Sequence, residues 1–222
     1  MVSSQWRHAI EGHAVNIRDE VELLRRLSKD GSAVGQRRLD KIDRLAQQIL
    51  AKGLTPPLTG QEGVESIDMD VLVRERLHQL QENENYQDIG FDFASECERP
   101  VTVRCSPEWL RHVVDLFVDN AVAAMRTVTL RQLRIKTRCV GAHLQIAFTD
   151  TGPGILPERI PLIGHQPVSK NPDEPGLGMG LLMAQMILQT YNGDITIGQT
   201  GPTGTTMCIR LPIEPGSTGR SA

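Results

Sequence analysis

Apolar residues near the amino terminus recur with the spacing of helices that pack along one face. In each of two stretches they lie three or four residues apart, which places them on the same side of a helix. The first set is Ile10, Ala14, Ile17, Val21 and Leu24, and the second is Leu39, Ile42, Ala46 and Ile49. Residues 30–35 between them are rich in turn-forming types, so the pattern predicts an antiparallel helical hairpin over residues 1–58.

A hairpin of this size buries too little apolar surface to be stable alone. Its apolar face therefore needs a partner, and the simplest is a second copy of the chain in a four-helix bundle. We expect a homodimer formed through the hairpin. The alternative is that the hairpin packs on the rest of its own chain.

A proline-rich segment at 54–60 interrupts the helical pattern, because proline lacks a donor and restricts the residue before it. We expect a hinge there, a second domain over residues 62–214 and a flexible tail over 215–222. The second domain contains short strands, most of them in consecutive pairs, and a few helices. Strands are expected near 65–69, 89–94, 101–105, 133–139, 144–149, 194–197 and 205–211, and helices near 70–82, 106–124 and 181–191.

The helix that begins after Ser106 has the clearest signals. Ser106 is a typical N-cap, and Pro107 suits the first turn. Its buried stripe is expected to comprise Leu110, Val113, Val114, Phe117, Ala121 and Ala124. Paired strands with few helices between them predict an α+β sandwich, one sheet with helices on one face, and not a Rossmann fold.

Composition narrows the class of protein without naming it. The 222 residues are 39% hydrophobic and 23% charged, with a formal net charge of −3, which is typical of globular protein and gives no basic nucleic-acid footprint. We expect no membrane segment, and the amino terminus lacks a secretory pattern, so a cytoplasmic location is expected. The four cysteines are widely spaced, which argues against a zinc site or disulfide framework and favours small buried side chains.

Three short segments carry candidate chemistry. They are Asp119-Asn120 within a helix, Asp150 to Gly154 after a strand, and Gly176 to Gly180 before a helix. A carboxylate at a strand end can accept from an exocyclic amine, and nearby glycines let the backbone approach a flat ring. A glycine-rich turn before a helix offers free N–H groups to phosphates, and an amide oxygen is a suitable ligand for Mg²⁺.

Taken in this order, the segments resemble the superfamily of gyrase, chaperone, histidine-kinase and MutL (GHKL) ATPases. VDNAVAAM at 118–125 is similar to its N box, DTGPGI at 150–155 to its first glycine box and GLGMGLLMAQMI at 176–187 to its second. GTTMCIRLP from Gly204 is similar to its closing strand, and HQPVSK at 165–170 to the lid motif of sensor histidine kinases. The resemblance implies a Bergerat-type α/β sandwich that binds ATP with Mg²⁺.

The resemblance also implies a role for each matching residue. Asn120 would hold Mg²⁺, Asp150 would bind the adenine amine, and Thr205 would support the base. Gly152 and Gly154 would shape the adenine pocket. Phosphate contacts would come from Lys170, Gly176, Gly178 and Gly180.

Two positions bear on the reaction. Hydrolytic members of the superfamily have a Glu four residues before the N-box Asn, where this chain has Leu116; the neighbouring Asp115 lies about 100° around the helix. In sensor kinases a His on the first hairpin helix accepts the phosphoryl group, and His8 matches that position, with His13 as the alternative. The acidic residue that usually follows this His is Ala9 here.

The resemblance therefore implies an ATP-dependent protein-histidine kinase that passes phosphoryl groups to a response regulator, under the control of an unidentified upstream sensor. A degenerate ATP-binding module that regulates a partner through its lid and hairpin is the alternative, favoured by Ala9. A serine kinase of the anti-sigma type shares the glycine boxes, but does not need the hairpin.

Overall fold

The computed structural model describes residues 63–165 and 180–215. All of them belong to the second of two compact units of the chain, residues 60–222. The predicted hairpin over 1–58, and all but the first residue of the predicted tail, lie outside the described residues. The domain boundaries therefore stay a prediction.

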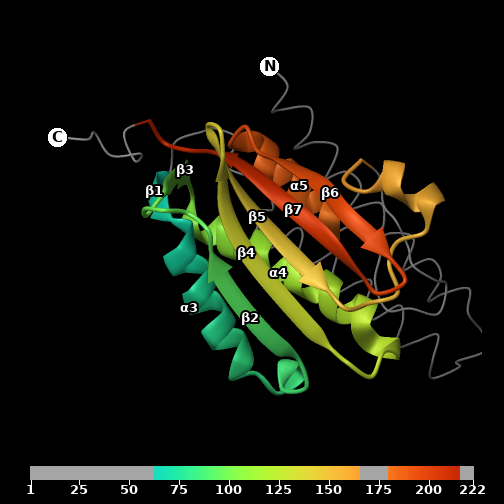
Figure 1. The fold of residues 1–222 in the computed structure, drawn as a ribbon. Helices are drawn as coiled ribbons and strands as arrows, with labels where there is room; N and C mark the ends of the chain where they lie inside the picture. The colour runs from blue at the N-terminus through green and yellow to red at the C-terminus, as the bar shows by residue number, and fades with distance from the viewer. Residues whose placement is uncertain (1–62, 166–179, 216–222) are drawn as a thin grey trace, which may run out of the picture. The chain divides into compact units, whose positions relative to one another are not determined.

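A five-stranded mixed sheet forms one layer of this unit (Figure 1), with the strand order β2, β4, β5, β7, β6. Strands β2 and β4 run parallel, and every other neighbouring pair is antiparallel. The strands are β2 (Gly90–Ser95), β4 (Gln132–Val140), β5 (His143–Asp150), β6 (Asp194–Gly201) and β7 (Gly204–Pro212).

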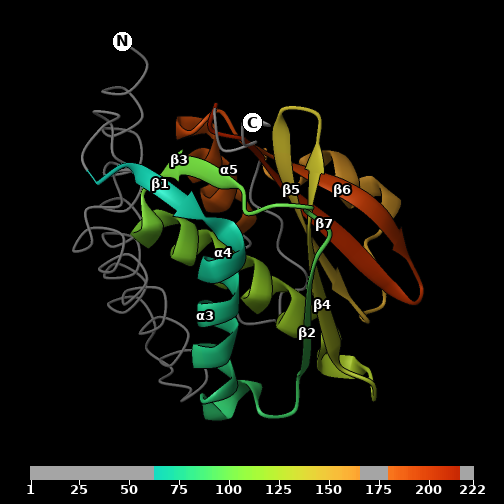
Figure 2. The ribbon, with the colours of Figure 1, turned by 60° about the vertical axis from the view of Figure 1, so that its left-hand side comes forward.

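Three helices make the second layer, and the turned view shows α3 and α4 together on one side of the sheet (Figure 2). They are α3 (Met69–Gln81), α4 (Pro107–Ala124) and α5 (Gly180–Thr190). Single 3₁₀ segments lie between the larger elements, at η1 (Glu84–Tyr86), η2 (Met125–Thr127) and η3 (Pro157–Leu162). The predicted α+β sandwich with helices on one face is confirmed.

The core lies between the two layers. Strand β5 alternates buried and half-buried residues along its whole length, as expected for a strand with one covered face. Phe148 of β5 meets Phe117 of α4 with ring centroids 4.9 Å apart. The stripe predicted for α4 is buried from Leu110 to Ala121, and Ala124 is half-buried.

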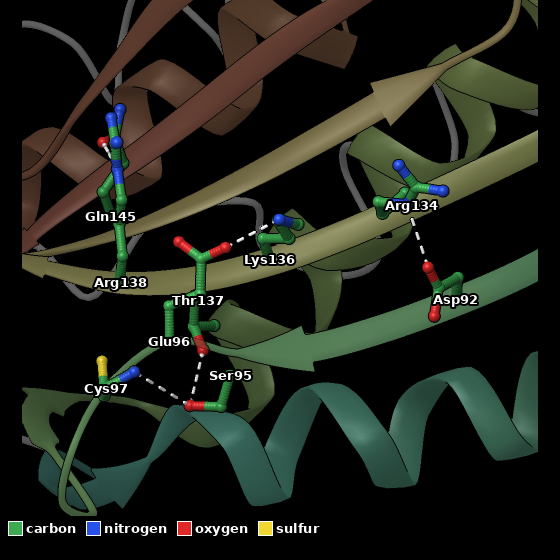
Figure 3. Close-up of polar contacts among 9 residues, drawn as sticks. All are labelled: Asp92, Ser95, Glu96, Cys97, Arg134, Lys136, Thr137, Arg138 and Gln145. Carbon is green, nitrogen blue, oxygen red and sulfur yellow. Dashed lines mark hydrogen bonds and ion pairs between the residues drawn. The ribbon is translucent and has the colours of Figure 1, made fainter.

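The opposite face of the sheet carries charged pairs between neighbouring strands (Figure 3). Asp92 of β2 accepts from Arg134 of β4 at 2.9 Å, and Glu96 pairs with Lys136 at 2.7 Å. All four side chains are solvent-exposed, so each pair contributes little to stability. On β4, Arg134 and Lys136 alternate with Leu133 and Ile135, which face the core. This alternation fixes the register of the strand, because a shift by one residue would bury the charged side chains.

Two of the expected strands form a separate sheet, so the prediction of a single sheet was wrong. Strands β1 (Glu65–Asp68) and β3 (Thr102–Cys105) pair with each other, antiparallel. Their buried residues Ile67 and Val103 join the core cluster that includes α3 and α4. Periodicity identifies strands but not their neighbours, since pairing depends on residues distant in sequence.

The cap predicted at Ser106 is correct in position but not in its hydrogen bond. Ser106 precedes α4 in the extended conformation and Pro107 opens the helix, yet the serine side chain makes no capping bond. That side chain is buried beside Tyr191 instead. Helix α3 has a working cap, because Asp68 accepts from the backbone N–H groups of Asp70 and Val71 at 2.9 and 3.2 Å.

The sequence predicted buried side chains for the four cysteines, and the structure shows this for only two of them. Cys105 and Cys208 are buried, Cys97 is half-buried and Cys139 is exposed. Within the described ranges, no helix combines the length and apolar character needed to cross a membrane.

The aromatic contact between α4 and β5 predicts a large stability effect. Phe117→Ala should lower the free energy of unfolding by about 3–5 kcal/mol, because it removes a side chain that is only 2% exposed and leaves a cavity. Leu130→Ala is the control, since Leu130 is 61% exposed and should cost less than about 0.5 kcal/mol. Urea denaturation of both variants tests this, and equal midpoints would contradict the assigned core.

Candidate functional site

The carboxylate of Asp150 ends a row of apolar residues. Leu144, Ile146 and Phe148 alternate along β5 toward the helices, and Asp150 takes the next position on that face. It is only 5% exposed. A buried carboxylate needs donors, and its Oδ1 accepts from the N–H of Gly152 at 2.8 Å and of Thr205 at 3.3 Å.

Hydroxyl groups extend this arrangement across the adjacent strands. Thr205 of β7 lies opposite Asp150 in the ladder, and its Oγ1 is 3.1 Å from Thr200 Oγ1 of β6. Thr200 Oγ1 also accepts from the N–H of Ile155 at 2.8 Å. The glycine segment after β5 is therefore held by the ends of β6 and β7, and sequence reasoning missed Thr200, which has no motif of its own.

The glycines allow backbone approaches that a side chain would block. Gly154 has φ +87°, and a Cβ there would lie 2.3 Å from the carbonyl oxygen of Gly201. A Cβ at Gly152 would lie 2.8 Å from Asp150 Oδ1, and one at Gly204 would lie 2.0 Å from the Asp150 carbonyl oxygen. Gly204 was expected only as the start of a strand, because the need for glycine there comes from strand packing.

Helix α4 brings Asn120 to the same end of the sheet. The Asn120 Nδ2 is 3.5 Å from the Met207 sulfur, and Met207 is two residues from Thr205 on the covered face of β7. The side chain is half-buried. Its amide thus lies on the helix side of the layer, toward the strand end that carries Asp150.

The acidic residues near Asn120 are engaged with other partners. Arg76 of α3 binds both carboxylate oxygens of Asp115, at 2.6 and 2.8 Å, and this hydrogen bonding raises the pKa of Arg76. The hydroxyl of Tyr86 donates to Asp119 at 2.5 Å. Burial, followed by the bond to Asp119, raises the pKa of Tyr86, so the phenol keeps its proton at neutral pH.

Leu116 faces the start of α5. A Cβ placed on Gly180 would lie 3.5 Å from Leu116 Cδ2, which is ordinary van der Waals contact. The first turn of α5 therefore meets α4 one turn before Asn120. An apolar side chain occupies the position at which hydrolytic members of the resembled superfamily have a glutamate.

The structure thus brings together one part of the predicted site. Asp150, Gly152, Gly154 and Thr205 are connected by the contacts above, and Asn120 and Gly180 lie on the adjoining helices. Lys170, Gly176 and Gly178 lie outside the described residues, as do His8 and His13. The binding roles of all these residues stay predictions.

Comparison with known families decides the class of this domain. Residues 105–215 match the family described as histidine kinase-, DNA gyrase B-, and HSP90-like ATPase. The chain belongs to this family. Within this ATPase family its relatives are sensor kinases, so the predicted GHKL domain of the histidine-kinase type is confirmed.

The sequence of this chain is similar to those of several sensor kinases. It is 25% identical over 218 residues to the sensory histidine kinase/phosphatase NtrB of Vibrio alginolyticus, covering 93% of this chain and 60% of that protein. It is 30% identical over 117 residues to the adaptive-response sensory kinase SasA of Rippkaea orientalis, covering 50% of this chain and 29% of that protein. The chain thus spans less than two thirds of the length of these relatives.

Solved structures share the fold. The mycobacterial sensor histidine kinase MprB matches 68% of this chain with a TM-score of 0.58 at 23% identity, over 99% of the MprB chain. Full-length ShkA, solved in complex with AMPPNP, matches 96% of this chain and 44% of its own, with a TM-score of 0.60 at 17% identity. At these identities the likeness supports the fold alone.

The positive φ and close approach at Gly154 predict a matched pair of variants. Gly154→Ala should destabilise this ATPase domain by at least ~2 kcal/mol, because the new methyl group would overlap the Gly201 carbonyl in a left-handed backbone. Gly201→Ala should be tolerated, since a Cβ there meets nothing within 4 Å. Thermal unfolding measures both, and comparable melting temperatures would contradict the close approach.

Proposed function

We propose that this chain is the core of a sensor histidine kinase. It binds ATP at the Asp150 end of the sheet, transfers the γ-phosphoryl group to a histidine of the amino-terminal region, and passes it to an aspartate of a response regulator. The observation that carries the proposal is the buried Asp150 carboxylate, held beside three glycines that permit close approach. Membership in the ATPase family and the sensor-kinase relatives support it.

Asp150 suits recognition of an adenine amine. A carboxylate has two oxygens with about four acceptor positions, and an exocyclic amine is a suitable donor to it. The surroundings are dry, because Thr205 is also 5% exposed and Phe148 and Met207 are buried. In such surroundings a charge-assisted hydrogen bond is stronger than in water.

Asn120 suits the Mg²⁺ that accompanies ATP. This ion commonly takes one or two protein oxygens, several waters and the phosphates, and the half-buried amide of Asn120 offers one such oxygen near the strand end. When bound, Mg²⁺ neutralises charge on the transferring phosphoryl group. The first turn of α5 would complete the phosphate side with its N–H groups.

Leu116 favours transfer to a protein group over transfer to water. It packs at the start of α5 and has no polar atom with which to orient or deprotonate a water. Asp115 accepts two hydrogen bonds from Arg76. Rapid hydrolysis is therefore not expected, and positioning of ATP against a histidine is the chemistry that the domain suits.

The remaining roles rest on the predicted hairpin. We propose that it forms a homodimer, presents His8 or His13 as the phosphoacceptor and docks the receiver domain of a response regulator in the cytoplasm. The name of its relative NtrB describes a histidine kinase and phosphatase. The second candidate, a non-catalytic ATP-binding regulator, is favoured by Ala9, because general-base help can contribute about 10²- to 10⁴-fold in rate.

The adenine role predicts a specific loss of affinity. Asp150→Asn should weaken binding of ATP or a non-hydrolysable analogue about 10- to 100-fold, because a charged acceptor is replaced by a neutral amide. Asp92→Asn is the matched control, since Asp92 pairs with Arg134 on the exposed face of the sheet and should bind as the parent does. Calorimetric titration of folded variants checks this, and unchanged affinity for Asp150→Asn would show that the pocket is misassigned.

The kinase reaction predicts a labelled histidine. The full chain incubated with γ-labelled ATP and Mg²⁺ should acquire acid-labile label that His8→Ala, or alternatively His13→Ala, abolishes while ATP affinity is retained. Acid-stable label would indicate a serine kinase instead. ATP binding without any label would favour the regulatory module.

A further inference from the structure

Two cysteines meet just beyond the point at which the pairing of strands β2 and β4 ends. These strands pair in parallel from Gly90 with Gln132 to Ser95 with Thr137, a constant offset of 42 positions. The N–H of Glu96 donates to the Thr137 carbonyl at 2.7 Å, which continues the ladder beyond β2. Cys97 and Cys139 have the same offset of 42, so they are the next partners on the face occupied by Ser95 and Thr137.

Their sulfur atoms are close. Cys139 Sγ lies 2.9 Å from Cys97 Sγ. Neighbouring strands lie about 4.7–4.9 Å apart, within the range of roughly 4.4–6.8 Å between the α-carbons of disulfide-bonded cysteines. The backbone N–H of Cys97 donates to Ser95 Oγ, 3.4 Å away (Figure 3). This bond helps to hold the chain after β2 close to β4.

The pair differs from the other cysteines in its access to solvent. Cys105 and Cys208 are 1% and 3% exposed, whereas Cys139 is exposed and Cys97 half-buried. Solution oxidants can therefore reach the pair but not the other two thiols. Thiolate character and access decide which cysteines react.

We propose that Cys97 and Cys139 form a reversible intramolecular disulfide, a redox modification site in the ATP-binding domain. The oxidant is a small-molecule disulfide such as oxidised glutathione. One oxidised glutathione and the two cysteine thiols give one protein disulfide and two reduced glutathiones, so two electrons and two protons pass from the cysteines to the oxidant. A reducing thiol reverses the reaction.

The environments of the two thiols set the order of events. Burial and the contact with Cys139 raise the pKa of Cys97 to about 12, so this thiol stays protonated at neutral pH. The exposed Cys139 loses its proton to solvent and attacks a glutathione sulfur first, which forms a mixed disulfide and releases one glutathione thiolate that takes up a proton. Cys97 then loses its proton to solvent and attacks the Cys139 sulfur, releasing the second glutathione.

The bond would fasten the loop between the two sheets. Cys97 begins the segment that leads into β3, and β3 pairs only with β1 among the described strands. A cross-link to β4 ties this segment to the large sheet. The candidate ATP site is remote, because Asp150 lies opposite Leu133, six residues along β4 from Cys139, or about 20 Å at the rise of a strand. Oxidation should therefore stabilise the domain and leave ATP affinity unchanged.

The test uses the full chain, equilibrated with mixtures of reduced and oxidised glutathione, quenched in acid, unfolded and alkylated. Mass spectrometry of the digest should find the Cys97 and Cys139 peptides joined, with Cys105 and Cys208 alkylated, and dithiothreitol should reverse the link. The oxidised protein should melt about 5–10 °C higher than the reduced protein. Alkylation of all four cysteines under oxidising conditions, or a link between two chains, would overturn the proposal.

Single substitutions give an independent check. In Cys97→Ser the resolving thiol is absent, so Cys139 should accumulate as a glutathione mixed disulfide, and the rise in melting temperature should vanish. If the parent protein also stops at mixed disulfides on both cysteines, the internal disulfide is refuted. Titration with an ATP analogue in both redox states should give equal affinities, and loss of ATP binding in the reduced protein would count against the proposed function rather than against the disulfide.

Discussion

The burial of one carboxylate governs the end of the sheet at which the candidate site lies. Asp150 continues the covered face of β5 beyond Phe148, where an apolar residue would extend the core. Its Oδ1 is satisfied by the N–H groups of Gly152 and Thr205, so the chain must turn sharply after β5 and the end of β7 must lie alongside. That geometry places backbone where Cβ atoms would collide at Gly152, Gly154 and Gly204. The buried carboxylate therefore requires the sharp turn, and the turn in turn requires the glycines.

Helix α4 connects this end of the sheet with the rest of the domain. Its apolar stripe packs on the sheet through Phe117, and its next turn carries Asn120. The two carboxylates near Asn120 on α4 have protein partners, because Arg76 donates to Asp115 and Tyr86 donates to Asp119. Leu116 fills the contact with α5 instead of offering a base. These arrangements favour a domain that positions ATP over one that activates water.

The small sheet is attached to the large one by its own polar contacts. Glu214, just after β7, accepts from the hydroxyls of Ser66 and Thr102 at 2.6 and 3.1 Å, and its N–H donates to the Thr102 carbonyl. The bond from Ser66 is the main reason why the pKa of Glu214 lies below its usual value. The proposed disulfide would act on the same junction from the β2 side.

The sequence by itself determined the kinds of elements and their order, and its motifs predicted which residues would bind the nucleotide. Periods of 2 and 3.6 arise from local backbone geometry, so β5 and α4 could be predicted from their own residues. Only the tertiary structure decided that β1 and β3 form a second sheet, that Gly204 and Thr200 support Asp150, and that Cys97 meets Cys139. Strand pairing joins residues far apart in the chain, and no local pattern records which strand becomes the neighbour of another.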